Sequence, residues 1–305
     1  MGTRGSALAL AQARQVAHEL ERLHPELTVE ETIIRTTGDK QQGLPLPEIG
    51  GKGVFTLEIE QALLSGEIDF AVHSLKDLPP AMPEGLCLAA VPQRETPCDV
   101  LILHSMNIPS VETGDVPLKI LPLEARIGTS SLRRRAMLLN LRPDLQVKDL
   151  RGNIDTRLRK LEEQGLHAIV LARAGLTRLG SQVEDSISLP ESWFIPAPGQ
   201  GALAIQARSN DLDTRAILLS MEDSPTRSAV AAERALVAEL NAGCSTPLGA
   251  LARAFDDTLT LNAVVLAPNG SERIAVSLEG SGDPELIGRR AARSLLEKGA
   301  AELLT

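Results

Sequence analysis

The apolar positions along this chain alternate between helical and strand-like spacing. Near the start, Ala9, Ala13 and Val16 recur every three or four residues, which places them on one face of a helix. Leu20 continues that face, and Ser6 is placed to cap the helix. Short apolar runs separate this helix from later helical segments. The alternation predicts an α/β fold built on a parallel sheet.

The same patterns predict the elements of the first two thirds of the chain. We expect strands at 28–35, 68–75, 126–128, 146–150 and 168–172. We expect further helices around 55–63, directly after Ser131, and around 154–161. Gly66 is placed to end the first of these helices.

The last third of the chain has a different pattern. The elements expected there are a helix at 224–241, strands at 258–266 and 273–278, and a helix at 285–298. Ser224 and Pro225 suit the N-cap and first turn of the first helix. The turn residues at 268–270 predict that the two strands form a hairpin.

Chain length and the breaks in these patterns predict three domains. A chain of 305 residues exceeds the usual size of one domain. The predicted division is a discontinuous first domain at 1–96 and 200–220, a second domain at 99–196 and a third at 224–305. Two prolines and two glycines at 196–201 indicate a crossover between the first two.

Composition narrows the classes of function. Aromatic residues make up 2% of the chain, so the stacking platforms of single-stranded nucleic-acid binding are missing. The net charge of −9 disfavours general binding to nucleic acid or to an anionic membrane. No apolar run approaches the roughly 18 residues of a membrane helix. We therefore expect a cytoplasmic protein with no nucleic-acid or membrane partner.

Cysteine and histidine usage gives no sign of a disulfide scaffold or a metal site, because neither CxxC nor HExxH spacing occurs. Cys87 lies in an apolar run and is expected in the core, and Cys98 is expected in a linker. Cys244 lies among small and turn-forming residues, so it is the accessible cysteine and a candidate nucleophile. No neighbouring histidine supplies a base, which disfavours a protease-like triad.

Positive charge is concentrated between Arg133 and Arg178. This segment holds nine Arg and two Lys against three Asp and two Glu, in a chain whose net charge is negative. A solvated helix face would explain most such runs. Here Arg133 and Arg134 follow a strand end and the turn 129–131, and similar turns lie at 151–153 and 3–6. Free N–H groups at such turns bind anions, and ligands of α/β sheets bind where strands end.

Three such turns predict a ligand with several carboxylates or phosphates. Arginine suits paired hydrogen bonds to planar carboxylates. A phosphate ligand stays open on the residues alone, although Gly53 after Lys52 breaks the Walker pattern.

Asp77 is a second candidate, because it follows the predicted strand at 68–75. A carboxylate at a strand end among arginines is either an ion-pair partner or a catalytic group that stabilises positive charge and moves protons. Lys76 beside it is either a ligand-binding or a surface lysine. Position alone does not decide between these interpretations.

Several long segments resemble a known family in the same order. They are TRGSALALAQA at 3–13, GGKGVF at 50–55, AVHSLKDLP at 71–79, GTSSLRR at 128–134, LRGN at 150–153, AGLTRLG at 174–180, PGQGA at 198–202 and Gly243-Cys244. With these segments the chain resembles the porphobilinogen deaminase family along almost its whole length.

The resemblance implies a fold, a reaction and a cofactor. The fold is α/β with three domains, two resembling type II periplasmic-binding-protein lobes and a smaller C-terminal α/β domain with an antiparallel sheet. The reaction deaminates four porphobilinogen molecules and joins them head to tail into hydroxymethylbilane, which hydrolysis releases. The primer is a dipyrromethane cofactor held by a thioether at Cys244. A monomer is expected, and the product is expected to pass to uroporphyrinogen III synthase.

The resemblance also implies residue roles. Asp77 matches the catalytic carboxylate, and no metal is expected. The residues matched to cofactor and substrate binding are Arg4, Ser6, Phe55, Ser74, Lys76, Thr129, Ser130, Ser131, Arg133, Arg134, Arg151, Gly152, Arg157, Arg178 and Gln200.

Two other classes share parts of this pattern. A two-lobed anion-binding protein or regulator domain would have the same lobes and arginines, but it does not explain a third domain with Cys244. A phosphate-transfer enzyme lacks a phosphate loop and a metal-ligand cluster.

Overall fold

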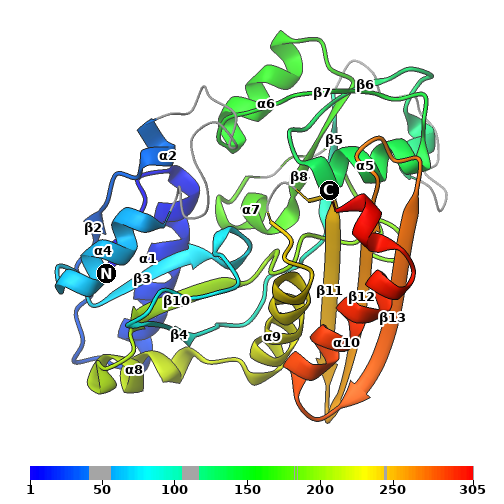
Figure 1. Cartoon of the computed structure of the whole chain (residues 1–305). Helices are drawn as coiled ribbons and strands as arrows, with labels where there is room; N and C mark the ends of the chain where they lie inside the picture. The colour runs from blue at the N-terminus through cyan, green and yellow to red at the C-terminus, as the bar shows by residue number, and fades with distance from the viewer. Residues whose placement is uncertain (41–55, 105–116, 182, 184, 244–245, 305) are drawn as a thin grey trace.

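The computed structural model describes residues 1–40, 56–104, 117–181, 183, 185–243 and 246–304. Within these residues the chain forms three β-sheets, each packed against helices (Figure 1). Two sheets have five strands, and the third has three. No helix among the described residues is long and apolar enough to cross a membrane. The three-domain division stays a prediction, and the separation into three sheets supports it.

The first sheet combines strands from both ends of the expected first domain. Its strands, in spatial order, are β2 (Thr32–Ile33), β1 (Gly2–Thr3), β3 (Phe70–Ser74), β10 (Leu203–Arg208) and β4 (Leu86–Ala90). Its helices are α1 (Ala7–Leu23), α2 (Thr37–Lys40), α4 (Leu57–Ser65) and α8 (Leu212–Leu218). Strand β1 is parallel to β2 and β3, whereas β10 is antiparallel to both of its neighbours.

Helices α1 and α4 pack on opposite faces of this sheet because successive strand side chains point in opposite directions. Val72 lies in a core cluster with Val16 and Leu20 of α1. Its neighbour Ala71 lies in a different cluster with Ile59 of α4. Both faces of β3 are therefore buried, and only its carboxyl end is left to carry polar side chains.

The second sheet has the same sequence of strand directions as the first. Its strands, in spatial order, are β7 (Gln146–Lys148), β6 (Arg126–Gly128), β8 (Ala168–Ala172), β5 (Asp99–Leu103) and β9 (Ser186–Ser188). Its helices are α5 (Leu132–Leu141), α6 (Ile154–Glu163) and α7 (Arg173–Arg178). Strand β6 is parallel to β7 and β8, and β5 is antiparallel to β8 and β9.

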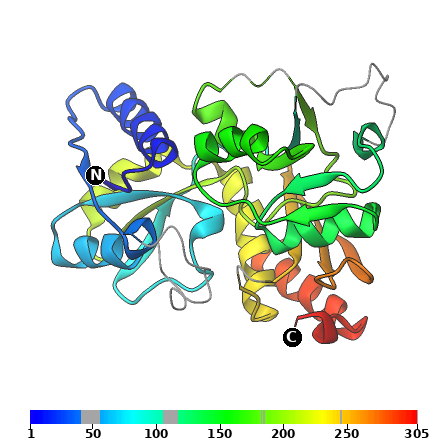
Figure 2. The ribbon, with the colours of Figure 1, turned by 90° about the horizontal axis from the view of Figure 1, so that it is seen from above.

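The chain passes twice between these two sheets, which lie side by side (Figure 2). It leaves the first sheet after β4, through 91–98, and returns to β10 through 189–202. Both connections carry residues of the candidate site, as described below.

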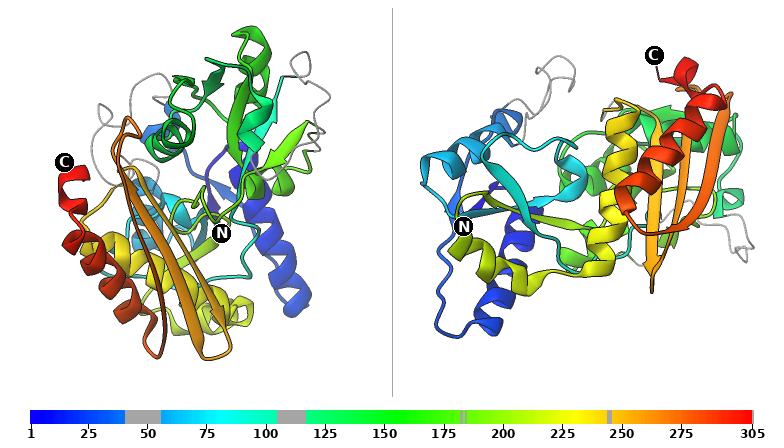
Figure 3. Two further views of the ribbon diagram at one scale, coloured as in Figure 1. Left: turned by 90° about the vertical axis from the view of Figure 1, so that its right-hand side faces the viewer. Right: turned by 60° about the horizontal axis from the view of Figure 1, so that its bottom comes forward.

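The third sheet is fully antiparallel, with β12 (Thr258–Leu266) between β11 (Leu248–Phe255) and β13 (Arg273–Ser281). Helices α9 (Ser224–Glu239) and α10 (Pro284–Glu297) lie together against it (Figure 3). Side chains of β11 and β12 also join the core cluster of α5, so the third sheet packs on the second.

Most predicted elements are confirmed. The strands at Arg126–Gly128 and Ala168–Ala172 have the predicted bounds, and Ser6 caps α1 by accepting a hydrogen bond from the Ala9 N–H. Gly66 ends α4 with a left-handed φ of 77°, a conformation that glycine adopts without strain. The α/β class and the C-terminal antiparallel sheet are confirmed.

Four predictions need correction. The strand expected at 28–35 is only Thr32–Ile33, an edge strand that pairs with β1 alone. The two large sheets are mixed rather than parallel, because β10 and β5 are antiparallel to their neighbours. Strands β4, β5, β9, β10 and β11 and helices α7 and α8 were not predicted. The N-cap of α9 is Asp223, whose carboxylate accepts from the Thr226 N–H, and Ser224 is already helical.

Candidate functional site

Asp77 lies where β3 ends at the surface. A 3₁₀ turn at Leu75–Asp77 follows the strand, and buried Leu75 and Leu78 fix the turn on both sides of the carboxylate. The Asp77 side chain itself is exposed. Since β1 and β3 are parallel neighbours, the turn after β1 lies beside it, and Asp77 shares a small pocket with Arg4, Ser6 and Ser74. The structure thus brings these predicted residues together.

Hydrogen bonds order the floor of this pocket. Gln12 of α1 donates to the Ser74 hydroxyl over 2.9 Å, and that hydroxyl also lies 3.2 Å from the Gln12 side-chain oxygen. His73 is buried and bonded to Gln206. Burial lowers the pKa of His73 to about 4, so its imidazole is neutral near pH 7. His73 therefore adds no positive charge to the pocket.

Lys76 is half-buried beside Asp77. Burial lowers the pKa of its ammonium group to about 8, and the Asp77 carboxylate partly opposes that change. Lys76 therefore loses its charge much closer to neutral pH than a surface lysine does.

The turn after β6 begins the second half of the site. The Thr129 hydroxyl accepts from the Ser131 N–H over 3.2 Å, and the Ser131 hydroxyl caps α5 by accepting from the Arg134 N–H. The Ser130 hydroxyl is buried and has no hydrogen-bond partner among the described residues. Thr129 and Ser131 therefore shape the turn, whereas the Ser130 hydroxyl does not take part in its hydrogen bonds, and its contact with a ligand stays a prediction.

Arg133 and Arg134 are buried and bind the carboxylate of Asp99. Arg134 donates through Nε and Nη2 to Oδ1, at 3.1 and 2.7 Å, and Arg133 Nη2 lies 2.8 Å from Oδ2. Burial alone would raise the pKa of the Asp99 carboxyl, but the two arginines and Gln200 together lower it to about 2. In this structure the two arginines thus pair with the protein's own carboxylate. Their binding to a ligand stays a prediction.

The turn after β7 supplies Arg151, Gly152 and Arg157. Asn153 caps α6, and Arg157 Nε donates to the Gly152 carbonyl over 2.8 Å. Gly152 has φ 120°, and a Cβ there would clash with Thr156 at 2.6 Å, so the turn requires glycine. Burial and Arg134 lower the pKa of Arg157 to about 10, while Asp77 opposes the change. Charges from both sheets therefore act on Arg157.

Arg178 and Gln200 lie at the passages between the sheets. Arg178 Nη2 donates over 2.7 Å to the carbonyl of Gly201, which links α7 to the returning connection. The Gln200 amide donates to the Pro97 carbonyl and to Asp99, at 2.7 and 2.9 Å. Burial lowers the pKa of Arg178, and Glu95 opposes the change.

Several buried polar atoms at this site have no hydrogen-bond partner among the described residues. Those from predicted site residues are Ser130 Oγ, Arg133 Nε, Arg178 Nε and Gln200 Oε1. Three of the four are donors, and buried donors without partners are costly. A ligand with several carboxylates would satisfy them, so the residues present fit a polycarboxylate cofactor.

Two carboxylates at this site were missed from the sequence. Asp99 opens the otherwise apolar strand Asp99–Leu103, and Glu233 lies at 0% exposure on the apolar face of α9. A charged residue within an apolar pattern was the available signal in both cases, since such a charge must be paired.

Glu233 joins three segments of the chain. Its carboxylate lies 2.7 Å from Arg94 Nη1 and accepts from the backbone N–H of Gly199 and of Ala252, at 2.6 and 2.8 Å. Arg94 also donates to the Gln200 carbonyl over 2.8 Å. Both connections between the sheets are therefore attached to α9.

Two predicted site residues, Phe55 and Cys244, lie outside the described residues. The other two cysteines are half-buried and unpaired. Cys87 was predicted to be a core residue but is only half-buried, although burial still raises the pKa of its thiol. Cys98 packs at the edge of a core cluster.

Models of one family match most of the chain. The model described as "Porphobilinogen deaminase, dipyromethane cofactor binding domain" matches residues 1–216, and "Porphobilinogen deaminase, C-terminal domain" matches 228–297. The curated relatives include porphobilinogen deaminases of Desulforudis audaxviator, at 48% identity, and Syntrophobacter fumaroxidans, at 45%. Each alignment covers 100% of this chain and 96% of the relative.

Similar solved structures are more distant. One is a periplasmic binding protein of Salmonella typhimurium with high arginine specificity, at 11% identity and a TM-score of 0.38. The match covers 72% of this chain and 83% of the chain of that binding protein. That score is too low to support an inference about ligand or activity.

Proposed function

Since this chain belongs to the porphobilinogen deaminase family, we propose that it joins four porphobilinogen molecules head to tail into hydroxymethylbilane, which water then releases. Family membership makes the protein a transferase of porphyrin biosynthesis that acts on a small molecule and uses a dipyrromethane cofactor. Family membership therefore excludes the two alternative classes, the anion-binding protein and the phosphate-transfer enzyme.

The observation that carries the proposal is the set of buried donors without partners at Ser130, Arg133 and Arg178. Each porphobilinogen ring carries an acetate and a propionate, so the ligand is rich in carboxylates. Each charge-assisted hydrogen bond to such a group contributes roughly 1.5–3 kcal/mol. Arg4, Arg151 and Arg157 are proposed to bind further carboxylates, because Arg4 and Arg151 lie on the turns after β1 and β7 and Arg157 lies in the first turns of α6.

Arg133 and Arg134 are proposed to bind ligand carboxylates while they stay close to Asp99. Each guanidinium has five N–H donors. Asp99 and the Ile195 carbonyl use Nη2 and Nη1 of Arg133, and Asp99 and the Val170 carbonyl use all three nitrogens of Arg134, so the remaining donors are Nε of Arg133 and the second N–H of each Nη. Asp99 is thus proposed to fix their planes, and Ser130 to add its free hydroxyl.

Asp77 is proposed as the catalytic carboxylate. Its exposed side chain shares a pocket with Arg4 and Ser74, so it can accept the pyrrole N–H of a substrate held by its carboxylates. As ammonia leaves, positive charge develops on the substrate ring. Two opposite charges about 4 Å apart attract each other by about 4 kcal/mol at an effective dielectric of 20. Full use of that energy would accelerate the step nearly a thousandfold.

Dipyrromethane supplies, when bound, the pyrrole carbon to which substrate is joined. We propose that Cys244 anchors it by a thioether, and that Phe55 and Gln200 line its site. Gln200 has a buried side-chain oxygen without a partner among the described residues, which suits acceptance of a pyrrole N–H.

The mass of the intact protein tests the anchor. We expect an excess equal to two porphobilinogen units less two ammonias, and expect Cys244→Ser to remove it. Cys87→Ser and Cys98→Ser are matched controls that should keep the excess. No excess after incubation of the wild type with porphobilinogen, or an excess retained by Cys244→Ser, would refute the proposal.

Three finer points belong to the same proposal. The protein is proposed to act as a monomer in the cytoplasm, and its product is proposed to pass to uroporphyrinogen III synthase. Light scattering on the purified enzyme at micromolar concentration tests the first point, since a mass of twice 32.5 kDa would contradict it.

A further inference from the structure

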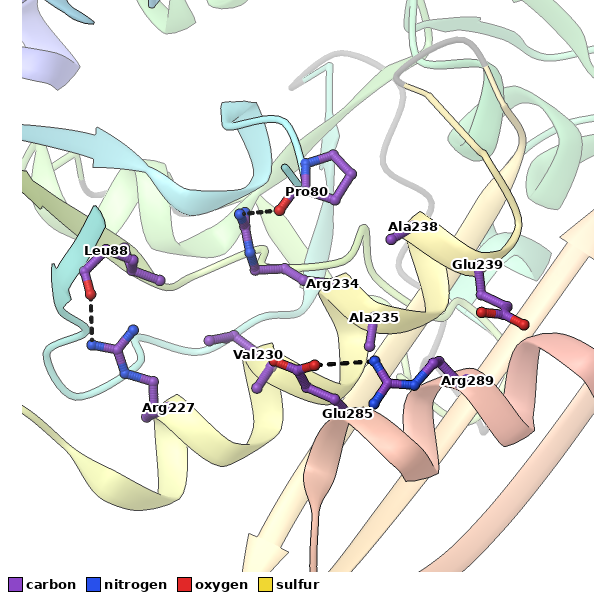
Figure 4. A pocket seen from close by; sticks show the side chains of 11 residues that line it. Pro80, Leu88, Arg227, Val230, Arg234, Ala235, Ala238, Glu239, Glu285 and Arg289 are labelled. Carbon is purple, nitrogen blue, oxygen red and sulfur yellow. Dashed lines mark hydrogen bonds and ion pairs between the residues drawn. The ribbon is translucent and has the colours of Figure 1, made fainter. Parts of the chain in front are cut away.

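A second pocket, of about 440 Å³, lies between α9, α10 and the segment that follows Asp77 (Figure 4). It shares no lining residue with the pocket of Asp77. Pro80 and Leu88 line it from the side of the first sheet, and the rest of the lining comes from the two helices. Its volume is within the range of small-molecule sites.

One wall of this second pocket is apolar. Its side chains come from α9 and are small: Ala231, together with Ala235 and Ala238, which are labelled in Figure 4, and the fully buried Val230 behind them. Small side chains give a helix a smooth surface, and Leu88 faces the same space. A planar apolar ring fits such a wall better than a branched or strongly polar molecule does.

Most charged side chains around the pocket are already paired with an opposite charge. Arg227 lies 2.5 Å from Glu222, and Arg289 lies 3.0 Å from Glu285. Glu239 lies 2.9 Å from Arg293. These pairs neutralise one another, so they give the pocket no net charge.

Arg234 is different. Its hydrogen bonds to described residues go through Nη2 to the carbonyls of Pro79 and Pro80, at 2.9 and 2.8 Å. Figure 4 shows the bond to Pro80. No carboxylate lies within 4.0 Å of it among the residues that the structure describes. Burial lowers the pKa of Arg234, and the nearby Arg227 lowers it further. A half-buried cation without a counterion attracts an anion.

We propose that this second pocket binds a small, flat organic carboxylate, with its ring on the α9 wall and its carboxylate on Arg234. The guanidinium keeps Nε and Nη1 for this purpose, because the proline carbonyls occupy only Nη2. The site is independent of the chemistry proposed at Asp77, so its test does not depend on turnover.

Binding of 1-naphthoate and of its neutral analogue 1-naphthamide to the purified enzyme, measured by calorimetry, tests the proposal. One charge-assisted hydrogen bond corresponds to a preference of about tenfold to a hundredfold for the carboxylate. Arg234→Gln should abolish the preference. Arg289→Gln is the matched control and should keep it, because Arg289 already has acidic partners.

A second variant shows where the compounds bind, and it keeps the proposal testable if Arg234→Gln does not fold. Ala231→Leu adds bulk to the α9 wall at a half-buried position and should weaken binding of both compounds at least tenfold. Binding that Ala231→Leu leaves unchanged would occur elsewhere, for example at the arginines of the active site. That outcome, equal affinity for the two compounds, or no binding of either would overturn the proposal.

Discussion

Asp77 at the end of β3 and Arg157 on α6 belong to different sheets, yet the Asp77 carboxylate raises the pKa of Arg157 against the lowering caused by burial and Arg134. The two charges are therefore close enough to act on each other across the space between the sheets. A substrate that binds there can meet a carboxylate from one side and a guanidinium from the other.

Asp77→Asn should lower kcat by two to three orders of magnitude, the loss of about 4 kcal/mol of charge stabilisation. Thermal stability should change little, because the side chain is exposed and makes no hydrogen bond or ion pair to another described residue. Steady-state kinetics and a melting curve measure both. Asp213→Asn, an exposed carboxylate on α8, is the matched control. Near-normal turnover of Asp77→Asn would remove Asp77 from the mechanism.

Lys76 should make substrate binding dependent on pH. Its pKa is lowered to about 8, so the ammonium loses its proton as pH rises through 8 and KM should then increase. Lys76→Arg should remove this increase, because arginine stays charged throughout that range. KM of the wild type and of Lys76→Arg, measured between pH 7 and 9.5, tests this prediction. An equal rise in both enzymes would assign it to another group.

Asp99 should contribute to stability in a pH-dependent way. Its folded pKa of about 2 is below the ordinary 3.8, so its contribution is present above about pH 4 and is lost as pH falls towards 2. The shift corresponds to about 2 kcal/mol. Asp99→Asn leaves two buried guanidiniums without a counterion and should cost about 3–5 kcal/mol at pH 7.

Urea unfolding across pH 2–7 tests this prediction. The free energy of unfolding of Asp99→Asn should be lower at pH 7 and should fall less steeply below pH 4. Asp213→Asn serves again as the exposed control. If Asp99→Asn and the wild type lost stability in parallel below pH 4, the Asp99 pair would not be the cause.

Arg94 and Glu233 should behave as one unit. Arg94→Met or Glu233→Gln should each lower the free energy of unfolding by about 3–5 kcal/mol, because each leaves a buried partner unpaired. The double variant should lose about 1–3 kcal/mol less than the sum of the two. Strictly additive losses would mean that the pair is not coupled.

The turns of the candidate site could be predicted because their signals are local. In each turn, the end of the strand and the residue that caps the next helix are only a few residues apart. Gly128 and Ser131 are the example after β6, and Asn153 caps the helix after β7. The partner of Arg133 and Arg134 could not be predicted in this way. Asp99 is 35 residues from Arg134, and the two meet because β8 pairs with both β5, which Asp99 opens, and β6, which precedes Arg134.

Strand direction was mispredicted for a similar reason. An apolar run such as 168–172 indicates a strand that is buried on both faces, but not which strands it joins or in which direction, and β10 itself was not predicted. Strand β10 lies between β3 and β4, more than a hundred residues from either in sequence. The edge strand β2 was overestimated because β propensity does not measure how much of a strand finds a partner.

The position of β10 has a consequence for synthesis on the ribosome. When β4 leaves the exit tunnel, its neighbour in the finished sheet has not yet been translated, because residues 91–202 come first. At 5–20 residues per second this delay is roughly 5–20 s. During it, the facing edges of β3 and β4 lack their partner and are exposed to other nascent chains. All five strands of the second sheet are translated before β10, so the second sheet can be complete while the first still lacks β10.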